Sequence, residues 1–62
     1  MDVRERFART ICVAAGLDPD RKGNTEHWRW QEFLDEADAI IDELKHDTAF
    51  RAELVAMLSE QP

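Results

Sequence analysis

The stretch Trp30–Lys45, WQEFLDEADAIIDELK, decides the fold. Its apolar residues recur at i, i+3, i+4, i+7, i+10, i+11 and i+14, the spacing of one continuous helical face: Trp30, Phe33, Leu34, Ala37, Ile40, Ile41 and Leu44. No alternation of apolar and polar residues competes with this pattern. We therefore predict a helix over about residues 26–45, with Asn24 or Thr25 as its N-cap.

A first helix is expected over about residues 3–15. Asp2 stands where an N-cap carboxylate accepts a hydrogen bond from the first turn, and Gly16 stands where a left-handed residue ends a helix. Leu17 then has the position from which a Schellman ending folds back on Cys12. The stripe expected to face the core is Val3, Phe7, Thr10, Ile11 and Ala14.

A third helix is expected over about residues 48–59, with Asp47 or Thr48 as its N-cap. Its apolar stripe is Phe50, Leu54, Met57 and Leu58. The connection around His46 is short, which favours an antiparallel helix packed on the second one. The pattern as a whole predicts an all-α fold, a small three-helix bundle.

The 62 residues are expected to form a single helical domain, residues 1–62, with residues 16–25 as the connector. A chain of this length has a thin core. Cys12 is the only cysteine, which excludes an internal disulfide and fits a reducing compartment. The chain has no apolar run of the roughly 20 residues that a membrane span needs, and its first ten residues lack the apolar region of a signal peptide. We therefore expect a cytoplasmic protein that does not bind membranes.

The net charge of −6 is unevenly distributed. Residues 1–24 hold five Arg and Lys against four acids, a balance of +1, whereas residues 25–62 hold three against ten, a balance of −7. Such an acidic field repels nucleic acid and accelerates association with basic surfaces. A partner with a basic surface is therefore favoured over a nucleic acid.

Most of this charge lies on one side of the second predicted helix. If Trp30 is placed at 0°, six acids fall between about 80° and 240°, opposite the apolar stripe. We call these residues the acidic face: Glu32, Asp35, Glu36, Asp38, Asp42 and Glu43. Many of them are like-charge neighbours at i+3 or i+4, each of which costs an isolated helix about 0.2–0.5 kcal/mol. A binding role explains this arrangement, and simple solubility is the alternative.

Trp28 falls in the middle of the acidic face on the same helical wheel. Exposed tryptophans are enriched at binding hot spots, so Trp28 is a candidate anchor for a partner. In the alternative, the helix begins a turn later and Trp28 folds over the connector or the first helix.

No motif points to catalysis or to a cofactor. The segment Asp18–Arg29 superficially resembles an EF-hand loop, but Lys22 and Arg29 occupy positions that require oxygen ligands. His27 and His46 have no further ligands at the spacing of a zinc site. No nucleophile has a base nearby in sequence, and no phosphate-binding loop is present. We expect neither an enzyme nor a bound metal or cofactor.

Three short helices also suit a DNA-binding helix-turn-helix, but its recognition helix should be neutral or basic. The predicted second helix is strongly acidic, and Arg51 is the only basic residue of the third. The one basic cluster, Arg4, Arg6 and Arg9 on the first helix, is expected to pair with acids elsewhere in the bundle.

The segment from Arg9 to Asp20, RTICVAAGLDPD, resembles an R-x-I-C-x-A-x-G-x-D-P-D pattern of short phage and prophage proteins. In those proteins a W-x-x-[YF]-L-x-x-A helix follows, which the chain matches at Trp30, Phe33, Leu34 and Ala37. The resemblance covers roughly residues 4–44. The matched residues are core and turn positions, so the resemblance implies no active site, and Trp28 and the third helix depart from the pattern.

In size and charge the chain is also similar to small acidic anti-CRISPR proteins, some of which look like DNA mimics. This resemblance implies a phage-encoded inhibitor that blocks a basic DNA-recognition surface of a type I CRISPR surveillance complex, such as one on a Cascade subunit. The acidic face and Trp28 would make the contact. The alternative is a small prophage accessory or assembly protein, a homodimer or adaptor that acts without DNA mimicry. The oligomeric state, monomer or homodimer, stays open.

Overall fold

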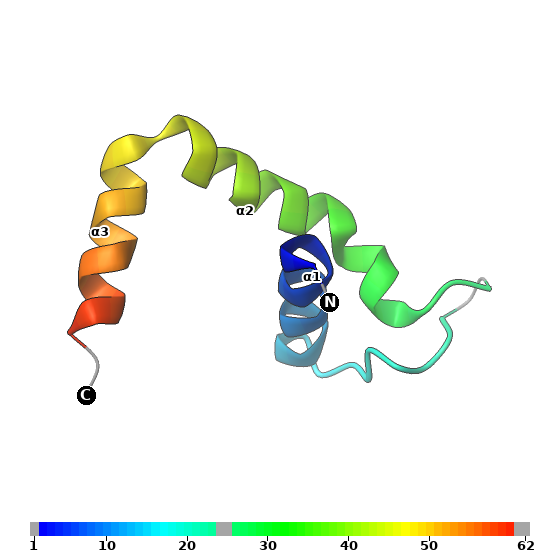
Figure 1. The fold of residues 1–62 in the computed structure, drawn as a ribbon. Helices are drawn as coiled ribbons and strands as arrows, with labels where there is room; N and C mark the ends of the chain where they lie inside the picture. Colours follow the sequence, from blue (N-terminus) through cyan, green and yellow to red (C-terminus); the bar gives the residue numbers. More distant parts are fainter. Residues whose placement is uncertain (1, 24–25, 61–62) are drawn as a thin grey trace.

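The structure is a computed structural model that describes residues 2–23 and 26–60. Its elements are α1 (Val3–Ala14), a 3-10 helix η1 (Arg29–Phe33), α2 (Leu34–His46) and α3 (Thr48–Ser59), shown in Figure 1. The regular elements are helical, which confirms the predicted all-α architecture with three α-helices. The bounds of α1 and α3 lie within one residue of those expected from the sequence.

Both ends of α1 form as their sequence signals predict. The Asp2 carboxylate accepts a hydrogen bond from the Glu5 N–H at 2.7 Å and so caps the first turn. Gly16 has a φ of 82°, in the left-handed region, and the Leu17 N–H donates to the Cys12 carbonyl at 3.1 Å. This is the bond pattern of a Schellman ending, which satisfies a carbonyl at the C-terminus of the helix.

The prediction that the second helix begins near residue 26 is wrong. The α-helix begins at Leu34, and residues 29–33 form η1. Residues 26–28 belong to the connector, which is therefore longer than the predicted 16–25. The two predicted N-caps, Asn24 and Thr25, lie outside the described residues.

Backbone pairing inside the connector explains the late start of α2. Lys22 and Trp28 form an isolated antiparallel bridge. The Arg29 N–H donates to the Arg21 carbonyl at 2.8 Å, and the Gly23 N–H donates to the His27 carbonyl at 3.1 Å. These bonds engage backbone groups that a helix starting at residue 26 would have needed.

The core lies where α1 crosses η1 and α2. Its fully buried residues are Ala8, Cys12 and Ala37, whose small side chains allow the helices to approach closely. The predicted core stripe of α1 is therefore on the wrong side. Val3 is 64% exposed, Thr10 and Ala14 are also exposed, and only Phe7 and Ile11 of that stripe are half-buried.

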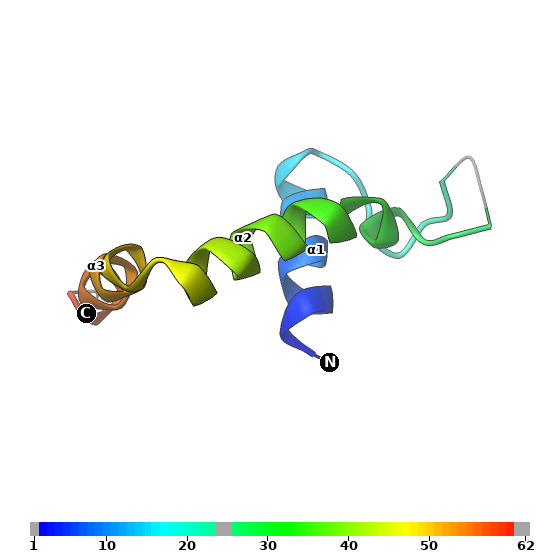
Figure 2. The same cartoon turned by 90° about the horizontal axis from the view of Figure 1, so that it is seen from above.

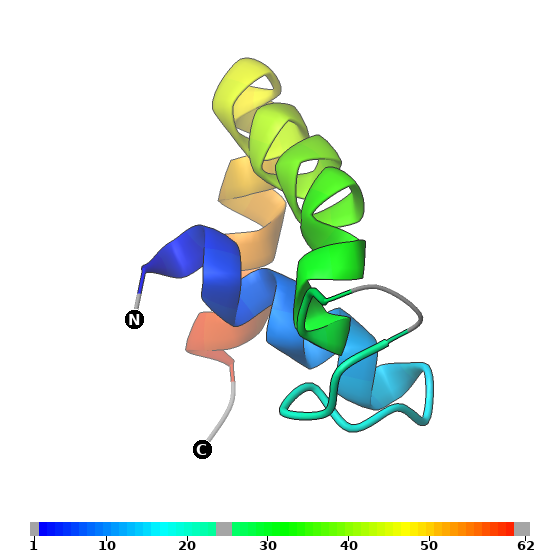
Figure 3. The same ribbon diagram turned by 90° about the vertical axis from the view of Figure 1, so that its right-hand side faces the viewer.

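The helix α3 stands apart from this core. Among the described residues, α3 contacts α2 but has no contact with α1. Figures 1 and 2 show α1 and α3 at opposite ends of α2, and Figure 3 shows α3 behind the crossing of α1 and α2. The radius of gyration is 13.6 Å, against about 10.6 Å for a compact domain of this length. The three helices therefore form an open arrangement.

Candidate interaction surface on the second helix

The helix α2 is covered on one side and open on the other. Ala37 is buried and Leu34 and Ile41 beside it are half-buried, whereas four acids on the other side are exposed: Asp35, Glu36, Asp42 and Glu43. These four form two rows, because Asp42 follows Asp35 and Glu43 follows Glu36 by seven residues. Each row is about 10 Å long at 1.5 Å per residue.

The remaining acid of α2, Asp38, is turned towards α1. Its carboxylate accepts two hydrogen bonds from the Arg4 guanidinium, from Nε at 2.5 Å and from the terminal nitrogen Nη2 at 2.8 Å. These bonds and the charge of Arg4 lower the pKa of Asp38, and the same pair raises the pKa of Arg4. Asp38 is thus a structural carboxylate that joins two helices, with its charge compensated.

Asp42 lies beside the only histidine of α2. The Nδ1 atom of His46 lies 3.1 Å from the Asp42 carboxylate and 2.9 Å from its backbone carbonyl oxygen. Both side chains are more than two-thirds exposed, so Asp42 remains accessible.

Glu32 lies on η1 and not on α2. Its carboxylate is close to the connector, since a Cβ at Gly23 would stand 2.5 Å from Glu32 Oε2. Glu32 is exposed, but it does not continue the rows of α2. The predicted i+3 and i+4 repulsions from Glu32 therefore do not arise within one α-helix.

Trp28 is 43% exposed but does not lie among the acids of α2. It precedes η1, and the Lys22 ammonium lies 5.4 Å from the centre of its ring. Gln31 accepts a hydrogen bond from the Trp28 N–H at 2.8 Å and fixes this part of the connector. This agrees with the alternative in which the helix begins later and Trp28 packs over the connector.

Ile40 is a candidate contact that the sequence pattern missed. It was expected in the core, but it is 37% exposed. On α2 it lies four residues after Glu36 and three before Glu43, so it borders their row. An apolar side chain between carboxylates can bury surface in a contact that the charges orient. The sequence pattern places Ile40 and Ile41 on the same apolar face. Ile40 is exposed and Ile41 is half-buried because of the direction from which α1 covers α2.

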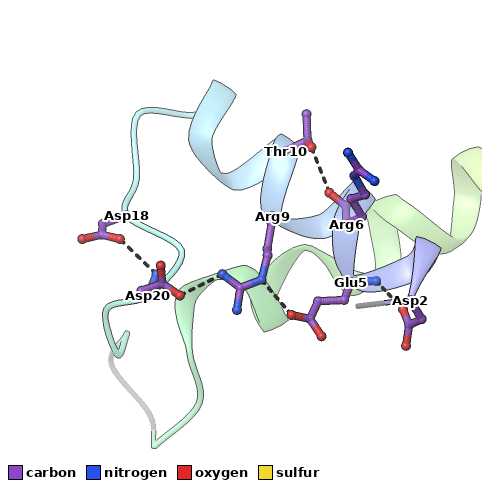
Figure 4. A network of polar contacts seen from close by, with 7 residues as sticks. All are labelled: Asp2, Glu5, Arg6, Arg9, Thr10, Asp18 and Asp20. Carbon is purple, nitrogen blue, oxygen red and sulfur yellow. Dashed lines mark hydrogen bonds and ion pairs between the residues drawn. The ribbon is translucent and has the colours of Figure 1, made fainter.

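An ion pair holds the connector against α1. Arg9 donates to Glu5 at 2.8 Å and to Asp20 of the connector at 2.8 Å, as Figure 4 shows. The Arg9 guanidinium also lies 5.3 Å from the ring of Trp30 on η1. The hydrogen bonds from Arg9 to Asp20 and Glu5 raise the pKa of Arg9. Of the predicted basic cluster, Arg4 and Arg9 therefore pair with acids, whereas Arg6 makes no ion pair among the described residues.

The thiol of Cys12 and the grouping of possible metal ligands bear on catalysis and metal binding. Cys12 is buried, and burial raises the pKa of its thiol, which opposes formation of a nucleophilic thiolate. Across residues 2–23 and 26–60, no three His, Cys, Asp or Glu side chains are grouped to hold a metal ion. In the same ranges, no helix combines the length and apolarity that a membrane crossing requires.

In comparisons with known proteins, no family model, curated protein or solved structure matches the chain. The fold and the exposed surface define a small all-α protein with one acidic helix.

Proposed function

We propose that the protein is a stoichiometric inhibitor whose α2 acids occupy a basic DNA-recognition surface. In the form that the resemblances favour, it is a phage-encoded anti-CRISPR protein that acts on a type I surveillance complex. The contact is made by Asp35, Glu36, Asp42 and Glu43, with Glu32 beside them at η1.

The axial density of carboxylates carries this proposal. The 13 residues of α2 span about 20 Å at 1.5 Å per residue. Its four exposed carboxylates, from Asp35 to Glu43, lie within about 12 Å of this length, at a mean spacing of about 4 Å. B-DNA presents one phosphate per about 3.4 Å along each strand. The helix therefore offers arginines and lysines a charge spacing close to that of one DNA strand.

The fixed position of α2 supports the same function. The Arg4–Asp38 pair and the small buried residues join α2 to α1. Carboxylates on a positioned helix lose less conformational entropy on binding than carboxylates on a free chain. Asp35 and Glu36 also lie in the first turn of α2, where the helix dipole stabilises negative charge.

The test is competition for DNA bound by a purified type I surveillance complex. Glu36→Lys with Glu43→Lys reverses one row of the acidic face. The dipole effects on stability are opposed, because one position is near the start of α2 and the other near its end. The matched control is Glu26→Lys with Glu60→Lys, which makes the same charge change at exposed acids outside α2.

The wild-type protein and the control should displace DNA, while the α2 variant should not, with equal helicity by circular dichroism. Two results would overturn the proposal: full displacement by the α2 variant, or the same loss in both variants. A wild-type protein that displaces no DNA from the complex would also overturn it.

A further inference from the structure

Two apolar surfaces that the sequence assigns to a core are exposed on separate helices. On α3, the distal part of the stripe is uncovered, with Met57 52% and Leu58 57% exposed. On α1, an open hollow is lined by Val3, Arg6, Phe7 and Thr10. Each surface exposes large apolar side chains, and among the described residues neither surface meets the other.

The junction between α2 and α3 prevents the chain from closing on itself. The helix α2 ends at His46 and α3 begins at Thr48, so Asp47 alone joins them. Antiparallel helix pairs use loops of about two to five residues. The Asp47 side chain accepts from the Phe50 N–H at 2.9 Å, and its own N–H donates to the Glu43 carbonyl at 2.9 Å. Folding α3 back onto α1 would break this capped junction.

We infer that the exposed stripe of α3 docks in the α1 hollow of a second copy of this chain, in a reciprocal two-fold dimer. Such an arrangement pairs the two surfaces twice and leaves no further copy of either exposed.

The surface area agrees with a dimer. The accessible surface is 4999 Å², whereas a compact monomer of 7.2 kDa exposes about 4,100 Å². The excess of about 900 Å² is close to the roughly 800 Å² that each partner buries in a standard interface. The open arrangement of the helices thus exposes an amount of surface that one dimer contact would remove.

The charges favour a second copy despite the acidic net charge. The helix α3 holds one base, Arg51, and one acid, Glu53, so it does not repel itself. Arg6 borders the α1 hollow. Among the described residues, neither Arg6 nor Glu53 makes an ion pair. In Figure 4 the Arg6 guanidinium points away from the ion pairs of Arg9. The dimer brings Arg6 of one copy towards Glu53 of the other.

Sedimentation equilibrium of the full chain over a range of concentrations tests the inference. The expected mass is twice the 7.2 kDa of one chain, and it should persist in concentrated salt because apolar contact dominates. Met57→Glu should raise the dissociation constant by about tenfold or more, since it places a carboxylate in the interface. Ala56→Glu is the matched control, because it adds the same charge about 100° around α3 from Met57, away from the apolar stripe, and should leave the dimer intact.

A charge exchange locates the second surface. Arg6→Glu and Glu53→Arg should each weaken the dimer, and the two together should restore it. A monomer at every concentration, or a dimer that Met57→Glu leaves unchanged, would overturn the inference. A dimer that the double exchange fails to restore would overturn the docking of α3 on α1. Displacement of DNA by Met57→Glu is measured separately, so failure of the dimer and failure of the proposed inhibition are distinguishable.

Discussion

Arg4 on α1 and Asp38 on α2 form a two-bond ion pair across 34 positions of the sequence, with Arg4 Nε 2.5 Å from Asp38 Oδ1. This pair compensates the carboxylate that lies between Asp35 and Asp42 on α2. The like-charge neighbours of α2, Asp35 with Asp38 and Asp38 with Asp42, both include Asp38. The repulsion predicted for the acidic helix is therefore relieved at both of these pairs, and the four exposed acids remain accessible to a partner.

The Arg4–Asp38 pair predicts a loss of stability in acid. The pKa of Asp38 is lowered in the folded protein from its ordinary value of 3.8. A lowered pKa contributes stability above the unfolded value, and this contribution is lost as the pH falls below 3.8 through the folded pKa. The free energy of unfolding is measured from about pH 5, where most carboxylates are ionised, to lower pH. In Arg4→Gln this free energy should depend less on pH than in the wild type. An unchanged acid profile would contradict the pairing.

Replacing Gly16 should reduce stability through backbone strain and not through a steric clash. Its φ of 82° is unfavourable for side chains, while a Cβ there would have no atom within 4 Å. Gly16→Ala should therefore lower the free energy of unfolding by about 1 kcal/mol through strain alone. Gly16→Asn should lose less, because asparagine tolerates the left-handed region. Urea unfolding of the two variants measures this order, and equal losses would contradict the proposed cause.

Asp47 is expected to control α3 more than the rest of the fold. Asp47→Ala removes the cap on the Phe50 N–H, at a cost of about 1 kcal/mol to the helix. Since α3 has no buried residue, amide exchange should accelerate in α3 and stay nearly unchanged in α1. Asp47→Asn, which keeps a capping oxygen, is the control and should exchange like the wild type. Equal acceleration in both helices would show that α3 is coupled to the core.

Cys12 is expected to react only when the core opens. It is fully buried, and burial raises the pKa of its thiol above the ordinary 9.0. A raised pKa means that stability is present below pH 9.0 and falls as the pH rises through the folded value. Labelling by an aromatic disulfide reagent should therefore be slow at neutral pH and follow the unfolding equilibrium when urea is added. Immediate labelling of native protein would contradict this core.

Local signals explain which parts of the fold the sequence predicts. Asp2, Gly16 and Asp47 act through hydrogen bonds or dihedral angles within a few residues, so their roles in α1 and α3 could be predicted. The apolar spacing likewise indicates α2 from Leu34 onwards. These features depend little on how the helices are arranged.

Features that depend on tertiary contacts could not be predicted in the same way. Which side of α1 is buried depends on the close approach that Ala8 and Cys12 permit, and the larger Val3 and Phe7 suggested another side. The bridge between Lys22 and Trp28 joins segments across the connector and removes Trp28 from the predicted helix. Of the candidate site, the sequence identifies the acids of α2. It does not predict the ion pair between Arg4 and Asp38 or the exposure of Ile40.

The salt dependence of binding to a DNA-recognition surface tests most directly whether the α2 acids make the contact. The logarithm of the affinity for a purified type I surveillance complex is measured against the logarithm of salt concentration. Affinity should fall steeply with salt for the wild type, and the slope should be much reduced by Glu36→Lys with Glu43→Lys but retained in Glu26→Lys with Glu60→Lys. Binding that is insensitive to salt, or equal slopes in the two double variants, would contradict a role for this helix as a substitute for DNA.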